Sequence, residues 1–194
     1  QSKRSEGSMF HGVCSTYLSK LRPGQDVVRV FNRPSSFRLP ADQKKPILMI
    51  GPGTGVAPMR ALLQERSHQR QSGPVGKNML YFGCKTEEQD YLYKDEMLDL
   101  QSCGDLDVLR VAFSRATKDK VYVQHLLMDD TEMIWDLIDR GGYIYLCGGV
   151  KMGQDVVRAL TDIVAAQKGV DAVGAKSLLD SLSASGRFVQ ELWA

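Results

Sequence analysis

The sequence predicts an α/β domain built on a doubly wound parallel sheet of five strands. From Pro46 onward, short apolar segments alternate with longer amphipathic segments. This alternation is typical of parallel strands that are covered by helices on both faces. A glycine-rich turn also follows the first apolar segment directly, as is common where a strand leads into a helix. With 194 residues, 43% of them hydrophobic, the chain is long enough to bury a substantial core.

Each predicted element follows from this alternation. The predicted strands are Ile47–Ile50, Asn78–Gly83, Asp107–Ser114, Tyr143–Cys147 and a final extended strand, Arg187–Trp193. The predicted helices are Ala57–Gln71, Tyr93–Leu100, Val121–Met128, Trp135–Arg140, Gln154–Gln167 and Asp171–Ser183. Pro58 falls in the first turn of its helix, where the missing N–H costs nothing.

Residues 1–45 form a separate region in this interpretation, and residues 46–194 form the α/β domain. The first region is rich in prolines and contains one short helical segment, around Val13–Leu21. Asp26–Phe31 has the character of a strand. Because the chain begins at Gln1 in a polar stretch, we expect it to be a piece of a longer protein.

Composition excludes several classes of protein. The 25 basic and 23 acidic residues leave a net charge of +2, too little to indicate nucleic acid or an anionic membrane as the main partner. No apolar run approaches the roughly 20 residues of a transmembrane helix. The four cysteines stand far apart without a zinc-site spacing, so we expect no metal and reduced thiols in a cytoplasmic protein.

The segment Ile47–Pro58, ILMIGPGTGVAP, is the first candidate binding motif. A glycine-rich turn at a helix N-terminus presents backbone N–H groups and a positive dipole end to a pyrophosphate. Gly51, Gly53 and Gly55 allow close approach of the backbone, and the Thr54 hydroxyl can donate to a phosphate oxygen. The spacing is GxGxG rather than GxGxxG, so a simple tight strand–helix connection remains the alternative.

The loop Ser114–Gln124 follows the third predicted strand and is the second candidate motif. Ligands of open parallel sheets bind beyond the carboxyl ends of the strands, so this loop and the glycine turn should face one crevice. The second strand ends in Gly83-Cys84-Lys85 without the acid that an NAD ribose requires, and Ser114, Arg115 and Lys120 follow the third. These residues favour a 2′-phosphate, and therefore NADPH over NADH, unless the loop is only a solvated charged segment.

Two further segments contain candidate site residues, but the sequence pattern does not decide their role. Tyr143–Gly149, YIYLCGG, delivers Cys147 to the same edge of the sheet, where it can serve simply as a small apolar residue before a turn. Trp193 either packs on the core or covers a ligand.

Taken together, GPGTGVAP, YFGC…DYLY, AFSR, KVYVQHLL and YLCG resemble the NADPH domain of the diflavin reductases, from about residue 12 onward. The resemblance implies a ferredoxin-reductase-type NADP-binding domain preceded by a remnant of the FAD-binding domain. It also implies an NADPH–hemoprotein reductase, of which most of the FAD domain and the FMN domain are absent here. NADPH would pass a hydride to FAD, and electrons would pass through FMN to a heme protein such as cytochrome P-450.

The resemblance also implies roles for individual residues. Cys147, Glu191 and Trp193 match the cysteine beside the reacting nicotinamide carbon, its supporting acid and the aromatic residue that stacks on the flavin. The matches to the NADP-binding residues are Gly51, Gly53, Thr54, Gly55, Ser114, Arg115, Lys120, Tyr122, Val123, Gln124 and Asp155. Gly12, Val13, Cys14 and Ser15 match the segment that wraps the FAD pyrophosphate.

Departures from the family pattern leave alternatives open. Gly149 stands where the family usually has Asp, the loop Val150–Met152 looks one residue short, and Glu191 replaces an Asp. The placement of the nicotinamide is therefore open. The alternatives are a related diflavin enzyme, such as sulfite reductase, methionine synthase reductase or nitric oxide synthase, and a non-catalytic nucleotide-binding module. A parent tethered to the cytosolic face of the endoplasmic reticulum would fit the family.

Overall fold

The computed structural model describes residues 11–193 and divides the chain into two compact units, residues 1–34 and residues 35–194. The second unit begins before the boundary predicted at residues 45/46. Phe37 and Leu39 pack against the buried core of this unit, and the Tyr145 hydroxyl donates to the Arg38 carbonyl at 2.7 Å. The assignment of the region before the sheet to an FAD-binding domain stays a prediction.

The described part of the first unit contains one short helix, α1 (Val13–Ser19), with Gly12 at its N-cap. The prediction of a strand at Asp26–Phe31 is wrong, because these residues form no strand. A strand needs a neighbouring strand to satisfy its backbone hydrogen-bonding groups, and residues 11–34 contain no strand that could pair with this segment. Val27, Val30 and Phe31 are largely exposed in this segment.

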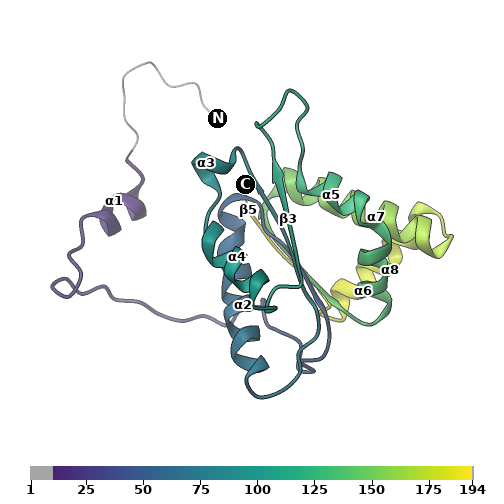
Figure 1. Cartoon of the computed structure of the whole chain (residues 1–194), viewed down its shortest axis with the longest axis horizontal. Coiled ribbons are helices and arrows are strands. Elements are labelled where there is room, and N and C mark those ends of the chain that lie inside the picture. The colour runs from purple at the N-terminus through teal and green to yellow at the C-terminus, as the bar shows by residue number, and fades with distance from the viewer. Residues whose placement is uncertain (1–10, 194) are drawn as a thin grey trace. The chain divides into compact units, whose positions relative to one another are not determined.

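The second unit is an α/β domain with a five-stranded sheet (Figure 1). Its strands are β1 (Ile47–Ile50), β2 (Asn78–Cys84), β3 (Val108–Phe113), β4 (Tyr143–Gly149) and β5 (Phe188–Trp193). They lie in the order β3-β2-β1-β4-β5, and every neighbouring pair is parallel. The predicted fold class is confirmed.

Helices cover both faces of this sheet. They are α2 (Val56–Arg70), α3 (Glu87–Asp90), α4 (Lys94–Ser102), α5 (Val123–Asp129), α6 (Thr131–Asp139), α7 (Val150–Lys168) and α8 (Ala172–Ala184), with a short 3₁₀ turn, η1 (Gly53–Gly55), before α2. Figure 1 shows α2 and α4 on one side of the sheet and α5 to α8 on the other.

The alternation of side chains along β1 explains the two faces. Leu48 and Ile50 belong to the core beneath α5 to α8, whereas Ile47 and Met49 belong to the core beneath α2 and α4. All four side chains are fully buried. A strand buried on both faces must be apolar throughout, which is why this segment reads as an unbroken apolar run.

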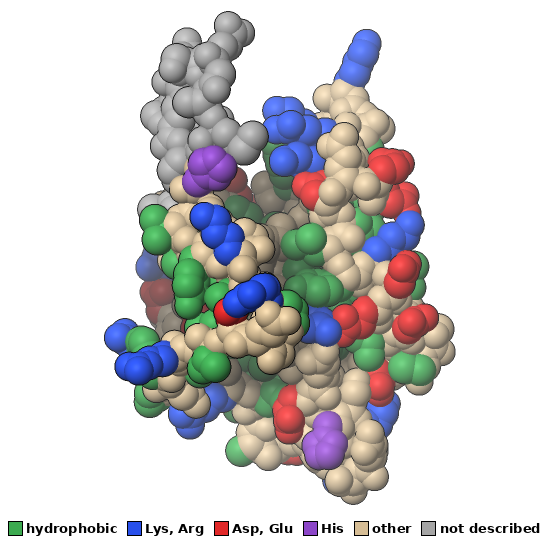
Figure 2. Space-filling model, turned by 90° about the vertical axis from the view of Figure 1, so that its left-hand side faces the viewer, with side chains coloured by type: hydrophobic (Ala, Val, Ile, Leu, Met, Phe, Trp, Pro, Cys, Tyr) green, Lys and Arg blue, Asp and Glu red, His purple; other side chains and the backbone are tan. Residues whose placement is uncertain are grey.

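The surface carries both signs of charge, as the face drawn in Figure 2 shows, in keeping with the net charge of +2. Within residues 11–193, no helix combines the length and apolar character needed to cross a bilayer.

Candidate nucleotide-binding site

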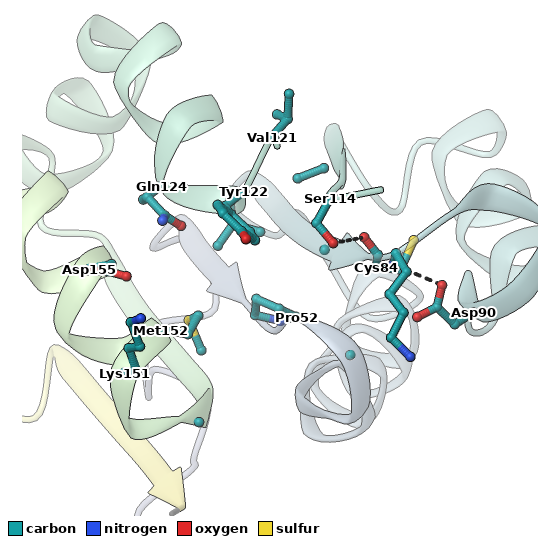
Figure 3. A pocket seen from close by; sticks show the side chains of 16 residues that line it. Pro52, Cys84, Asp90, Ser114, Val121, Tyr122, Gln124, Lys151, Met152 and Asp155 are labelled. Carbon is teal, nitrogen blue, oxygen red and sulfur yellow. Dashed lines mark hydrogen bonds between the residues drawn. The ribbon is translucent and has the colours of Figure 1, made fainter. Parts of the chain in front are cut away.

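A pocket of about 600 Å³ opens at the carboxyl ends of the strands (Figure 3). In a doubly wound sheet with this strand order, that edge is where dinucleotides bind. The residues that line it are Pro52, Gly53, Gly83, Cys84, Lys85, Asp90, Ala112, Ser114, Val121, Tyr122, Val123, Gln124, Gly149, Lys151, Met152 and Asp155. Segments far apart in sequence therefore meet around one cavity.

The glycine turn between β1 and α2 is folded too tightly for side chains. A Cβ at Gly51 would lie 2.4 Å from the Gly55 carbonyl oxygen, and a Cβ at Gly55 would lie 2.1 Å from the Cys147 carbonyl oxygen. Gly53 has a φ of +57° and nothing within 4 Å of the Cβ position, so its backbone lines open space in the pocket. This cradle allows a phosphate to approach the backbone closely.

Two long helices begin at this edge. The 15-residue α2 starts at Val56 and the 19-residue α7 at Val150, and their N-cap residues are Gly55 and Gly149. Neither N-cap contributes a side-chain hydrogen bond to the helix. At the start of α2 the N–H groups of Gly55 and Val56 donate to carbonyls of the η1 turn, whereas the first-turn N–H groups of α7 and the positive end of its dipole are available to an anion, in agreement with a pyrophosphate site.

Two lysines line the pocket: the sequence places Lys85 at the end of the second strand without counting it among the named site residues, and it gives Lys151 no role. Lys85 follows β2, and Lys151 lies in the first turn of α7 (Figure 3). The Lys85 loop is held by Asp90, whose Oδ1 accepts the backbone N–H groups of Lys85 and Thr86 at 2.9 and 3.0 Å. The Asp90 carboxylate is thereby engaged by the protein. The place of Lys85 at the carboxyl end of β2 was the signal that could have identified it.

The structure brings only some of the predicted cofactor-binding residues to the pocket wall. Those that line it are Gly53, Ser114, Tyr122, Val123, Gln124 and Asp155, whereas Gly51, Thr54, Gly55, Arg115 and Lys120 do not. Arg115 and Lys120 are exposed in the loop between β3 and α5. The backbone N–H of Arg115 donates to the Lys85 carbonyl at 2.8 Å, so this loop is tied to the pocket rim.

Gln124 provides a separate indication of a ligand. Its side-chain Oε1 is buried and finds no hydrogen-bond partner among the described residues. An unpaired buried acceptor costs free energy that a bound donor would recover. Because Gln124 lines the pocket, a polar ligand there fits this atom.

Gly12, Val13, Cys14 and Ser15 lie at the start of α1, in the first unit. The Ser15 hydroxyl donates to the Gly12 carbonyl at 3.4 Å, and Val13 is 88% exposed. Their predicted role at an FAD pyrophosphate stays a prediction.

Cys147, Glu191 and Trp193 lie on the edge formed by β4 and β5, and none of them lines the pocket. Cys147 pairs in register with Glu191, and Gly149 pairs with Trp193. Cys147 is buried, and burial, followed by the nearby Glu191 carboxylate, raises the pKa of its thiol. The cysteine is therefore an uncharged group at neutral pH. The close approach of Gly55 to the Cys147 carbonyl joins this edge to the glycine turn.

The fold and this site define a dinucleotide-binding α/β domain, and comparisons with known proteins agree. Residues 49–158 match the family model of the oxidoreductase NAD-binding domain. The chain is 41% identical over 186 residues to NADPH–cytochrome P450 reductase of Dictyostelium discoideum, covering 94% of this chain and 28% of that protein. It is 40% identical to the Homo sapiens and 41% identical to the Bos taurus protein of the same name, covering 97% of this chain and 29% of each.

The chain belongs to the oxidoreductase NAD-binding domain family, as that domain occurs in the diflavin reductases. The resemblance drawn from its motifs is thereby confirmed. The chain spans less than a third of the length of these curated relatives.

Proposed function

We propose that this domain binds NADP(H) and positions its nicotinamide ring for hydride transfer to an FAD. The observation that carries the proposal is the pocket itself. Gly53 of the glycine turn and the uncapped start of α7 face a cavity whose β2 side ends in Lys85 rather than in a free acid. Such a site favours a dinucleotide that carries an additional phosphate.

The residues divide the work between two ends of the site. The glycine turn and the start of α7 hold the pyrophosphate through backbone N–H groups. Ser114, Arg115, Lys120 and Tyr122, with Lys85, hold the 2′-phosphate end. The edge with Cys147, Glu191 and Trp193 receives the nicotinamide end, where a buried neutral thiol offers a polar but uncharged surface.

When bound, NADPH supplies the hydride and FAD accepts it. The protein residues contribute by holding the reacting groups close together and by excluding water. In the whole reductase, by this proposal, electrons continue through FMN to a heme protein such as cytochrome P-450. The names of the relatives support this acceptor.

Calorimetric titration of the purified chain with 2′,5′-ADP and with 5′-AMP tests the proposal. We expect 2′,5′-ADP to bind more tightly. Arg115→Ala should weaken 2′,5′-ADP by about ten- to a hundredfold and leave 5′-AMP unchanged, since a hydrogen bond to a charged group contributes about 1.5–3 kcal/mol. Lys118→Ala, in the same exposed loop, is the matched control. Equal affinities for the two nucleotides would refute the proposed 2′-phosphate site.

A further inference from the structure

A hydroxyl from outside the sheet contacts the acid on the β5 edge. Ser35 Oγ donates to Glu191 Oε1 at 3.3 Å. Ser35 Oγ also accepts a hydrogen bond from the backbone N–H of Phe37 at 3.0 Å. A serine hydroxyl has a single proton. Because the amide of Phe37 occupies a lone pair, the proton is free to point toward the carboxylate. At 3.3 Å this hydrogen bond is long, so it orients Glu191 without immobilising it.

The loop that carries Ser35 is anchored to the sheet by contacts with Tyr145. The ring of Phe37 lies 5.6 Å from that of Tyr145 on β4, and the Tyr145 hydroxyl donates to the Arg38 carbonyl at 2.7 Å. Arg38 Nε in turn donates to the Ser35 carbonyl at 3.0 Å. Since Tyr145 is fully buried, this support is part of the core. Ser35 is therefore held in place independently of Glu191.

Glu191 needs such a partner because its side chain is exposed. A free glutamate samples several rotamers, and most of its conformations point into water. Its neighbour across the ladder is Cys147, and paired residues of parallel strands project to the same face. The position of the Glu191 carboxylate thus decides how strongly its charge acts on the Cys147 thiol.

We propose that Ser35 is a positioning residue: its hydroxyl holds the Glu191 carboxylate over the Cys147 side of the β4–β5 edge. Its consequence for hydride transfer rests on the proposed function, because that function places the nicotinamide at this edge. The contact itself does not depend on a nucleotide. It can therefore be tested on the chain alone.

The test measures the rate at which Cys147 is alkylated by iodoacetamide between pH 7 and pH 10, with the modified peptide quantified by mass spectrometry. Ser35→Ala should release the carboxylate, weaken its effect on the thiol and accelerate alkylation at pH 8.5 about two- to threefold, because a lower thiol pKa raises the fraction of reactive thiolate. Ser35→Thr keeps the hydroxyl and should keep the original rate. Ser36→Ala, next in the chain, is the matched control.

The decisive variant is the double substitution. Glu191→Gln removes the charge, so Ser35→Ala should add nothing to it if Ser35 acts through Glu191. Additive acceleration would overturn the proposal, because it would show that Ser35 only shields the thiol. An unchanged rate in Ser35→Ala would overturn it as well. Titration of the original chain with 2′,5′-ADP separates the two proposals: absence of binding would refute the proposed function without affecting the thiol result.

Discussion

Replacing Gly55 by alanine should be among the most damaging single-methyl changes in this domain. The new Cβ would lie 2.1 Å from the carbonyl oxygen of Cys147 and 2.9 Å from its carbonyl carbon. Both atoms belong to the backbone of β4, which pairs with β1 on one side and β5 on the other. The clash cannot be relieved by rotating a side chain. Either the ladder or the glycine turn has to move.

The expected size of the effect follows from this geometry. Overpacking in a well-packed interior costs about 1–3 kcal/mol, and we expect the upper end because two backbone segments are forced apart. For a domain of this size, a loss of about 3 kcal/mol lowers the melting temperature by roughly 6–12 °C. Displacement of the turn should also weaken binding of 2′,5′-ADP, since the turn forms the start of α2.

Urea unfolding and thermal melting of Gly55→Ala measure the cost directly. Gly149→Ala is the matched control, because it stands at the same edge with ordinary backbone angles and its Cβ would meet nothing closer than the Trp193 carbonyl oxygen at 3.9 Å. That variant should lose at most about 1 kcal/mol, the usual cost of alanine at an N-cap. If both variants are equally stable, the close contact between the turn and β4 does not exist in solution.

Three other changes test the packing and the protonation of buried groups in the domain. Arg66→Leu should lower the free energy of urea unfolding by more than about 3 kcal/mol, because the buried guanidinium donates hydrogen bonds to four acceptors. Arg70→Leu breaks only a partly exposed ion pair and should cost under about 1 kcal/mol. Trp193→Ala should cost less than half as much as the roughly 3–5 kcal/mol of Phe188→Ala on the same strand, because Trp193 is 46% exposed and Phe188 only 4%; equal losses would assign Trp193 to the core and argue against a ring that covers a ligand. Burial raises the pKa of Cys84 to about 11, above that of the unfolded chain. The difference in unfolding free energy between the original chain and Cys84→Ala should therefore be complete below pH 9 and decline as the pH rises toward 11. A difference that stays constant from pH 8 to pH 10.5 would contradict this.

Much of the fold could be predicted because local pattern and tertiary burial agree. Ile47–Ile50 is predicted to the residue, since a proline precedes it, a glycine follows it and both faces are buried. The start of α7 was predicted at Gln154 but lies at Val150. Gly153 interrupts the helical pattern there, yet a Cβ at that position would lie 2.5 Å from Leu192 Cδ1. A side chain there would displace the Leu192 side chain of β5, and no local signal shows this contact.

The misread start of α7 also explains why Lys151 escaped assignment. In the sequence it follows Gly149 in what looks like a loop, whereas in the structure it lies in the first helical turn beside the pocket. The short helix α3 was likewise not predicted, because its four residues are too few to show a helical period. Asp26–Phe31 shows the opposite error. Its residues favour a strand, but the described unit offers no strand to pair with.

The pairing of Cys147 with Glu191 depends on information that no local pattern contains. It requires β5 to lie next to β4, in parallel, in one particular register. A shift by one residue would turn Glu191 to the other face of the sheet. The family resemblance could suggest the pair, but only the ladder places the two residues side by side.

The two ends of the site therefore differ in what holds them. The end that we propose for the phosphates is made largely of backbone, from the glycine turn and the starts of α2 and α7, so its geometry follows from the fold itself. The β4–β5 edge is made of side chains, and its arrangement depends on a register and on a loop anchored by Tyr145. Substitution of single side chains should consequently change the nicotinamide end while leaving the anchoring of the pyrophosphate nearly intact. On this division, Glu191 can depart from the family pattern without disturbing the glycine turn that we propose to hold the phosphates.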